Sequence, residues 1–224
     1  LGLAAPSRTA VLPGSGIDLT QFKPMAIAPR PPGSRHFLLI ARLLWDKGIA
    51  EYVAAARRVR AIYPDCRFQL LGFLDVENRT AVGRADVEGW VRDGTIEYLG
   101  ATDDVRPYIN AADCIVLPSY REGTARTLLE AAAMGKPLIA TDVPGCNNVV
   151  AHGVNGYLAE VRNAGDLALQ IETMAALASP EVAAMGRRSR AKVERDFDEG
   201  FVIERYLELL EPLRAQHARP VSRA

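Results

Sequence analysis

Two glutamates, Glu122 and Glu130, lie eight residues apart in a segment that follows a short apolar run and opens a predicted helix over about residues 123–134. Eight residues of helix rise about 12 Å and return to nearly the same face. Because carboxylates accept hydrogen bonds from hydroxyl groups, this separation suits two polyol groups joined by a diphosphate, namely a sugar and a ribose. The alternative is that the helix dipole alone favours these acids and that Glu130 is a surface residue.

The sequence around Glu130 bears on that alternative. Leu128, Leu129 and three alanines at 131–133 flank it. A carboxylate on so apolar a helix is expected to be partly buried, and it then needs hydrogen-bonding partners.

The start of the same predicted helix could hold an anion. Backbone N–H groups near Gly123, Thr124 and Ala125 are expected to lack helical acceptors, and the helix dipole favours negative charge at this end. Gly123 would also allow a ligand to approach the backbone closely. A phosphate is the expected anion.

Two cations follow the apolar run at residues 37–41. Arg42 offers a planar fork and Lys47 a point charge, and a diphosphate needs such cations. The alternative is that Arg42 pairs with a nearby acid and that Lys47 is solvated. The turn containing Gly14 and Gly16 could bring N–H groups near phosphate, although a flexible junction explains it equally well. No G-x-G-x-x-G fingerprint follows this turn.

Other chemistries lack support. Neither a G-x-S-x-G nor a P-loop pattern occurs, the three histidines have no ligand spacing, and Asp103-Asp104 reads better as a cap for a helix at Val105 than as a metal site. We therefore predict no metal site. Three cysteines without C-x-x-C spacing predict buried, reduced thiols. A net charge of zero argues against nucleic acid as a partner.

The elements that must position these residues alternate along the chain. Apolar runs predict strands at 37–41, 68–72, 96–99, 114–117, 137–140 and 156–158. Helices are predicted at 48–62, 85–92, 105–111, 123–134, 146–151, 164–178, 180–195 and 198–217. Such alternation predicts an α/β fold, a doubly wound parallel sheet of about six strands with helices on both faces. Ligands then bind beyond the carboxyl ends of the strands.

The ends of the chain differ from its middle. Residues 1–35 are rich in Pro and Gly and are interpreted as an interdomain junction with one short strand at 10–12. Residues 36–200 form the predicted ligand-binding domain, and residues 201–224 a C-terminal helix and tail. The apolar face of that helix is expected mainly to pack in the core, with part of it available to dock a further domain.

Several motifs together resemble a known family. They are Gly14-Ser15-Gly16-Ile17-Asp18, Ala41-Arg42-Leu43 with Lys47-Gly48, Pro118-Ser119 with Glu122-Gly123 and Glu130-Ala131, Gly135-Lys136-Pro137, and Gly153-Val154-Asn155-Gly156. In this order they resemble the C-terminal, donor-binding domain of retaining glycosyltransferases of the GT-B fold, family four (group 1). The resemblance extends to bacterial enzymes that build lipid-linked glycans, which often use UDP-sugars.

The resemblance implies roles for four side chains. Arg42 and Lys47 would neutralise the donor diphosphate and stabilise charge on the departing nucleotide. Glu122 would hold hydroxyls of the donor sugar, and Glu130 would bind the ribose.

The resemblance also implies roles for backbone and loop residues. The N–H groups of Gly123, Thr124 and Ala125, with those near Gly14 and Gly16, would face phosphate, and the loop from Leu99 to Thr102 would lie against the base. Two departures from the family pattern are Ala125, where relatives often have proline, and Asn147-Asn148, where many have a charged pair. The second leaves the donor preference open.

The resemblance further implies partners and location. The substrate would be a nucleotide-sugar, with UDP expected, and no cofactor would be required. A saccharide or lipid-linked acceptor would be bound by an N-terminal domain missing from this chain, so the fragment alone is expected to transfer sugar poorly. The full-length protein would be cytoplasmic, with peripheral contact at the inner face of the plasma membrane.

Three rival interpretations remain at this stage. A GT-B sugar-nucleotide epimerase would need acid–base groups that this chain does not offer convincingly. A non-catalytic sugar-nucleotide-binding module would keep the same binding residues. A generic NAD-binding domain is disfavoured by the absent fingerprint.

Overall fold

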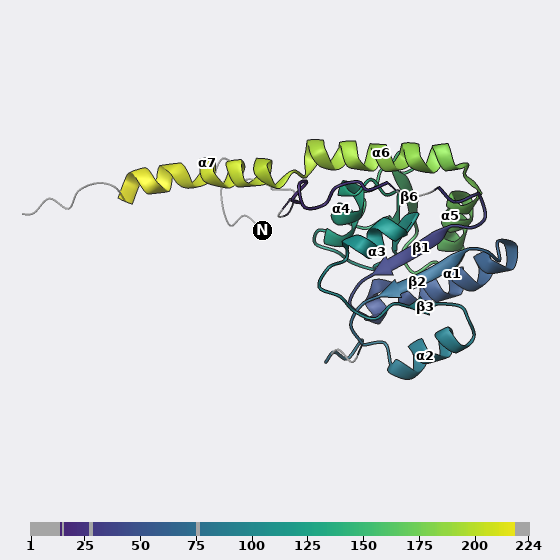
Figure 1. Ribbon diagram of the computed structural model, residues 1–224. Coiled ribbons are helices and arrows are strands. Elements are labelled where there is room, and N and C mark those ends of the chain that lie inside the picture. Colours follow the sequence, from purple (N-terminus) through teal and green to yellow (C-terminus); the bar gives the residue numbers. More distant parts are fainter. Residues whose placement is uncertain (1–13, 15, 27–28, 75–76, 218–224) are drawn as a thin grey trace, which may run out of the picture.

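A computed structural model describes residues 14, 16–26, 29–74 and 77–217 (Figure 1). Its centre is one parallel sheet with strand order β3-β2-β1-β4-β5-β6. The strands are β1 (His36–Ile40), β2 (Arg67–Leu71), β3 (Glu97–Tyr98), β4 (Cys114–Leu117), β5 (Leu138–Thr141) and β6 (Gly156–Ala159). The predicted fold class is confirmed, whereas the strand predicted at residues 10–12 lies outside the described residues.

The central strands are apolar throughout because both faces of the sheet are covered. Along β1, Phe37 and Leu39 point into one hydrophobic cluster, and Leu38 and Ile40 point into the other. All four residues are buried. This is the reason that a continuous apolar run, rather than an alternating one, marks the strand.

The helices divide between the two faces. Helices α1 (Ile49–Ile62), α2 (Arg84–Arg92) and α5 (Ala164–Ala176) supply the first cluster, while α3 (Arg106–Ala111) and α4 (Arg126–Ala133) supply the second. Helix α6 (Ser179–Asp196) contributes to both. A single 3-10 turn, η2 (Trp45–Lys47), links β1 to α1. The two-faced covering agrees with the predicted doubly wound architecture.

Two predicted helices differ from the structure. Helix α4 begins at Arg126 and not near residue 123. The helix predicted at 146–151 is a series of turns. The buried Asn155 side chain organises this segment, because its Oδ1 accepts from the Ala151 N–H at 2.7 Å and its Nδ2 donates to Val149 O at 3.1 Å. Side-chain hydrogen bonds thus replace part of a helical ladder.

Helix α7 (Glu199–His217) projects from the body beyond the end of α6 (Figure 1). Apolar residues on it leave roughly half of their surface exposed, namely Phe201, Ile203, Tyr206, Leu207 and Leu210. The expectation that this face packs mainly in the core is therefore wrong for these residues, because no described element covers the projecting helix. Among the side chains of α7 that the structure describes, only Val202, near its start, is a buried core residue.

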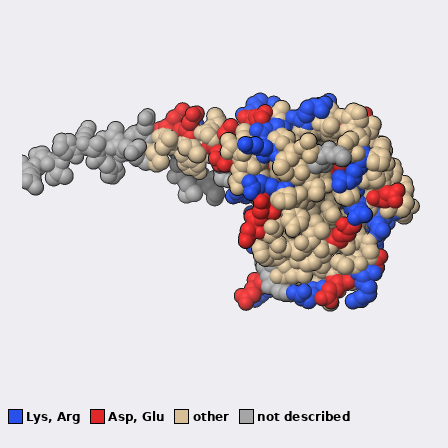
Figure 2. Space-filling view, in the orientation of Figure 1, with Lys and Arg blue, Asp and Glu red and all other residues tan. Residues whose placement is uncertain are grey.

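The described surface in Figure 2 carries interspersed positive and negative side chains around a central area made mostly of uncharged residues. Nowhere in the described part of the chain is a helix both long and apolar enough to span a bilayer. The cysteines Cys66, Cys114 and Cys146 are all buried and unpaired, as predicted.

Candidate donor-binding site

The loops after β1 and β4 meet at the centre of the carboxyl edge of the sheet. From β1 the chain proceeds to β2 and β3 on one side, and then returns to β4, β5 and β6 on the other. Strand order therefore reverses between β1 and β4, where a doubly wound sheet opens its ligand crevice. Arg42 and Lys47 come from the first loop, and Glu122 comes from the second.

Gly48 allows these two loops to touch. Its φ of +72° is in the left-handed region, and a Cβ placed on it would lie 2.0 Å from the Pro118 carbonyl oxygen. No other residue fits there without moving the backbone. The start of α1 consequently packs directly on the end of β4.

Hydrogen bonds then lock the loops in register. The Asp46 carbonyl accepts from the Tyr120 N–H at 2.9 Å and from Ser119 Oγ at 3.3 Å. The Tyr120 hydroxyl donates to Glu51 Oε1 at 2.7 Å, and the Arg162 guanidinium lies 4.6 Å from the centre of the Tyr120 ring. Burial, together with Glu51, raises the pKa of Tyr120 to about 12.

The sequence did not predict the contacts of Tyr120 with Glu51 and Arg162. Glu51 is 69 residues from Tyr120, and Arg162 comes from the loop after β6. No spacing in the sequence relates these three residues, so their contact could not have been found without the fold.

Lys47 and Glu122 form an ion pair across the two loops. Lys47 Nζ lies 2.6 Å from Glu122 Oε1, with 16% and 14% of the respective side chains exposed. The alternative that Lys47 is merely solvated is therefore wrong. Arg42 is exposed and its side chain has no hydrogen bond or ion pair among the described residues, so the alternative that it pairs with a nearby acid is not met in this structure. Their roles toward a donor stay predictions.

The predicted anion cradle needs one correction. The Ala125 N–H donates to the Gly145 carbonyl at 3.3 Å, and is not available to a phosphate. Within the described part of the chain, the N–H groups of Gly123 and Thr124 have no such acceptor. The space beside the Gly123 Cα is open, so a ligand could approach its backbone.

The geometric relation of the two glutamates also changes. Glu122 precedes the first residue of α4 by four positions, so the helical rise and rotation that the sequence predicted do not apply to the pair. The position of Glu122 is set instead by its loop. The carbonyl oxygen of Glu122 lies against Gly145. Only Glu130 lies on the helix.

Glu130 is buried, as its apolar neighbours predicted. Its Oε1 accepts from Arg126 Nε at 2.9 Å, one helical turn earlier. Burial raises the pKa of the Glu130 carboxyl, and Arg126 offsets part of the rise. The i,i+4 spacing of Arg126 and Glu130 is a signal that could have found this partner in the sequence.

The two glycines of the first turn have separate surroundings. A Cβ on Gly14 would lie 2.6 Å from Thr124 Oγ1, which places this turn against the predicted cradle. A Cβ on Gly16 would instead lie 2.6 Å from the Glu199 Cα, at the start of α7. The structure thus brings Gly14, and not Gly16, to Thr124.

The loop predicted to face the base follows β3 at the same edge of the sheet. Leu99 continues the strand with an N–H bond to Leu70 O at 2.9 Å. The Thr102 hydroxyl closes a turn by donating to Asp104 O at 3.1 Å. Asp104 Oδ1 accepts from the Arg106 N–H at 3.1 Å, which confirms Asp104, but not Asp103, as a group that satisfies the first turn of α3.

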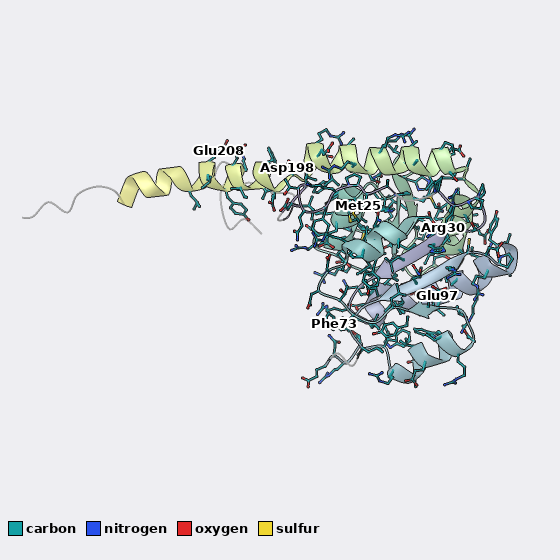
Figure 3. The ribbon with its side chains drawn as sticks, viewed as in Figure 1. Met25, Arg30, Phe73, Glu97, Asp198 and Glu208 are labelled. Atoms are coloured by element: carbon teal, nitrogen blue, oxygen red, sulfur yellow. The ribbon has the colours of Figure 1, made fainter. Side chains whose placement is uncertain are left out.

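The opposite, amino edge of the sheet holds two hollows of about 480 and 340 Å³. In Figure 3, Arg30 and Glu97 mark the amino edge and Phe73, which follows β2, marks the carboxyl edge. Lys136 lines the smaller hollow and donates to the carbonyls of Asn110 and Ala112 at 2.7 and 2.9 Å. These hollows are far from Lys47 and Glu122 in the fold, and contain none of the predicted site residues.

The described ranges contain no group of three or more His, Cys, Asp or Glu side chains arranged to share a metal ion.

A doubly wound parallel sheet covered by helices on both faces, with cations and carboxylates gathered at its switch point, defines a Rossmann-like domain. The chain matches the family Glycosyl transferases group 1 over residues 34–176, and it belongs to that family.

Curated relatives share this part of the molecule. The N,N'-diacetylbacillosaminyl-diphospho-undecaprenol alpha-1,3-N-acetylgalactosaminyltransferase of Campylobacter jejuni is 33% identical over 172 residues, which cover 77% of this chain and 43% of that protein. The putative colanic acid biosynthesis glycosyltransferase WcaL of Escherichia coli is 27% identical, with 94% and 53% covered. The chain thus spans about half the length of the curated relatives it matches.

Solved structures agree on the fold. Sucrose-phosphate synthase from Thermosynechococcus elongatus superposes with a TM-score of 0.75 at 27% identity, covering 90% of this chain and 52% of that one. Anabaena HepE in complex with UDP-glucose gives a TM-score of 0.69 at 21% identity, covering 89% and 56%. The described domain corresponds to one half of a GT-B fold.

Proposed function

We propose that this chain is the donor-binding domain of a retaining glycosyltransferase that uses a UDP-sugar. The full-length protein would move a hexose-type sugar to a saccharide or lipid-linked acceptor in the assembly of cell-surface glycans. The observation that carries this proposal is the Lys47–Glu122 ion pair at the switch point, beside the N–H groups of Gly123 and Thr124, for which the described residues offer no acceptor. In this pair, a cation that would bind phosphate lies next to a carboxylate that would accept from hydroxyls.

The donor diphosphate would lie between the two loops. Lys47 and the exposed Arg42 would neutralise it, and the N–H groups of Gly123 and Thr124 would hydrogen-bond its oxygens. When the bond between the sugar and the diphosphate breaks, the electron pair stays on the phosphate oxygen. The same cations would then stabilise the added charge on the departing nucleotide.

The hydroxyl groups of the donor would meet the two carboxylates. Glu122 would accept from the sugar hydroxyls and Glu130 from the ribose. Gly14 lies against Thr124 and could add a backbone N–H, while Leu99 and Thr102 would face the base.

The relatives supply the substrate classes. Anabaena HepE binds UDP-glucose, and Staphylococcus aureus TarM was solved with UDP and alpha-GlcNAc-glycerol. The Campylobacter jejuni relative is named for an undecaprenol diphosphate acceptor. These names support UDP as the nucleotide and a lipid-linked saccharide as one class of acceptor. We expect the full-length protein to meet such an acceptor at the cytoplasmic face of the plasma membrane.

The acceptor half of the cleft would come from an N-terminal domain outside this chain. The present chain spans about half the length of its relatives. We therefore expect the chain alone to bind a donor weakly and to transfer sugar poorly.

Calorimetry with UDP, GDP, ADP and NAD tests the function. UDP should bind, and Lys47→Ala and Glu130→Ala should each weaken it by roughly tenfold or more, the loss expected when a charge-assisted hydrogen bond is removed. Glu88→Ala, an exposed change on α2, is the control and should leave the affinity unchanged. Binding of NAD alone, or UDP binding that both site variants leave intact, would contradict the proposal.

A further inference from the structure

We infer that the Lys47–Glu122 ion pair makes the site discriminate between an intact sugar nucleotide and the spent nucleoside diphosphate. This inference rests on the proposed function and deepens it. It assigns to Glu122 a second task besides holding the sugar, which is to weaken the binding of the product.

The two side chains are already committed to each other before any ligand arrives. Their 2.6 Å contact joins residues 75 positions apart in the sequence. The backbone on both sides is held in place, by the Tyr120 N–H to Asp46 O bond and by the contact of Gly48 with Pro118. The backbone that carries the two side chains is thus fixed, so a ligand must compete with the pair for Lys47.

A diphosphate competes for Lys47 and leaves Glu122 without its cation. Only 14% of the Glu122 side chain is exposed, so water compensates incompletely for the lost partner. A carboxylate that is deprived of its partner and lies near a diphosphate is unfavourable, because it is both underbonded and repelled.

Whether the free-energy cost of separating Lys47 from Glu122 is recovered depends on the sugar of the ligand. An intact donor brings hydroxyl groups that donate to Glu122 in place of Lys47 Nζ. A nucleoside diphosphate brings none, so it bears the full cost. A site that hydrogen-bonds a group in its ligand rejects the analogue lacking that group for this reason.

The second ion pair of the site should not discriminate in this way. Arg126 holds Glu130 at 2.9 Å on the same helix, and Glu130 is proposed to bind the ribose. Since the ribose is present both in the donor and in the product, breaking this pair is compensated equally in the two complexes. Glu130 therefore serves as the matched control for Glu122.

The test is calorimetry on the 224-residue chain with UDP, UDP-glucose and UDP-N-acetylgalactosamine. Glu122→Gln removes the charge and frees Lys47 while preserving shape. It should tighten UDP by about tenfold, equivalent to about 1.4 kcal/mol, and should not tighten the UDP-sugars. Glu130→Gln should weaken UDP and UDP-sugars by the same factor. Glu88→Gln should alter none of these affinities.

A double variant isolates the role of Lys47. In a Lys47→Gln background, adding Glu122→Gln should tighten UDP by less than it does alone, because no cation remains to be released. Circular dichroism of each variant verifies that it is folded.

The outcomes separate the two claims. If Glu122→Gln binds UDP no more tightly than the wild type, or tightens UDP and UDP-sugars equally, the inference is overturned and the proposed function stands. If the wild type and Glu122→Gln are folded and neither binds any UDP compound, the proposed function fails and the inference fails with it.

Discussion

Two lysines at opposite edges of the sheet have contrasting surroundings. Lys47, at the carboxyl edge, has a side-chain carboxylate as its partner and is partly exposed. Lys136, at the amino edge, is buried and donates to two backbone carbonyls. A carboxylate on a loop can be replaced by a ligand phosphate, whereas carbonyls that end a helix and precede a strand cannot be replaced. Lys47 could therefore exchange its partner for a phosphate, in line with its proposed role, whereas Lys136 stabilises the fold.

Arginines repeat the contrast. Arg126 at the carboxyl edge is largely exposed and bonds to one carboxylate. Arg190 donates to the carbonyls of Phe22 and Ala133 at 2.8 and 2.7 Å and so connects α6 to distant segments. Charge alone therefore does not identify a site. Arg190 also pairs with the Glu194 carboxylate at 2.6 Å, and its bonds to backbone carbonyls are what distinguish it from Arg126.

The amino edge should carry the larger share of stability, and Asp113→Ala tests this most strongly. Asp113 is buried, and its Oδ2 accepts from Arg30 Nη1 at 3.0 Å and from the His36 N–H at 2.8 Å. Its loss leaves both donors unpaired, and should lower the free energy of unfolding by about 3 kcal/mol in urea titrations.

A carboxyl-edge ion pair supplies the control for that experiment. Arg106→Gln removes an exposed pair with Asp104 and should cost less than about 1 kcal/mol. Equal losses of unfolding free energy in Asp113→Ala and Arg106→Gln would contradict the larger contribution of the amino edge to stability.

The buried state of Lys136 should be detectable in the pH dependence of the free energy of unfolding. Burial lowers its pKa from 10.5 to about 8. Between these values the unfolded chain binds a proton that the folded chain has released, so the free energy of unfolding gains a term that rises with pH. Relative to Lys136→Met, the wild type should gain about 1 kcal/mol between pH 7.5 and 9.

Urea titrations across this range measure the gain, and the exposed Lys23→Met controls for the loss of a lysine. Parallel pH profiles for the wild type and Lys136→Met would show that Lys136 ionises as it does in the unfolded chain.

The smallest expected effect is a gain in stability at the binding edge. Because burial raises the pKa of Glu130, the folded chain holds that proton to higher pH than the unfolded chain, and ionisation above the ordinary pKa of 4.5 costs stability. Glu130→Gln should therefore raise the free energy of unfolding at pH 7 by about 0.5 kcal/mol, with the gain lost near pH 4.

The same substitution should weaken UDP binding, so stability and affinity move in opposite directions. Glu194→Gln, at an exposed i,i+4 pair with Arg190, should instead lose a few tenths of a kcal/mol, roughly the worth of such a pair. A Glu130→Gln variant that is less stable than the wild type at pH 7 would show that the carboxylate supports the fold.

Much of the fold was predictable from local patterns. The apolar run at residues 37–41 predicts a doubly covered strand because burial on both faces leaves no room for polar alternation. Once the strands are parallel, the loops with Lys47 and Glu122 must lie at the same edge, so their proximity was predictable as well. The first residue of α4 was not predictable. The Ala125 N–H donates to the Gly145 carbonyl, which belongs to a loop that the local sequence does not specify.

The amino-acid sequence by itself determined the order of strands and helices, the family motifs and the burial of Glu130, since each depends on residues near one another in the chain. Only the tertiary structure decided that Lys47 is paired with Glu122, that Tyr120 is held by Glu51, and that several described apolar side chains of α7 stay exposed. These outcomes depend on which distant segments meet. That is set by the packing of the whole sheet and its helices, which no local pattern encodes.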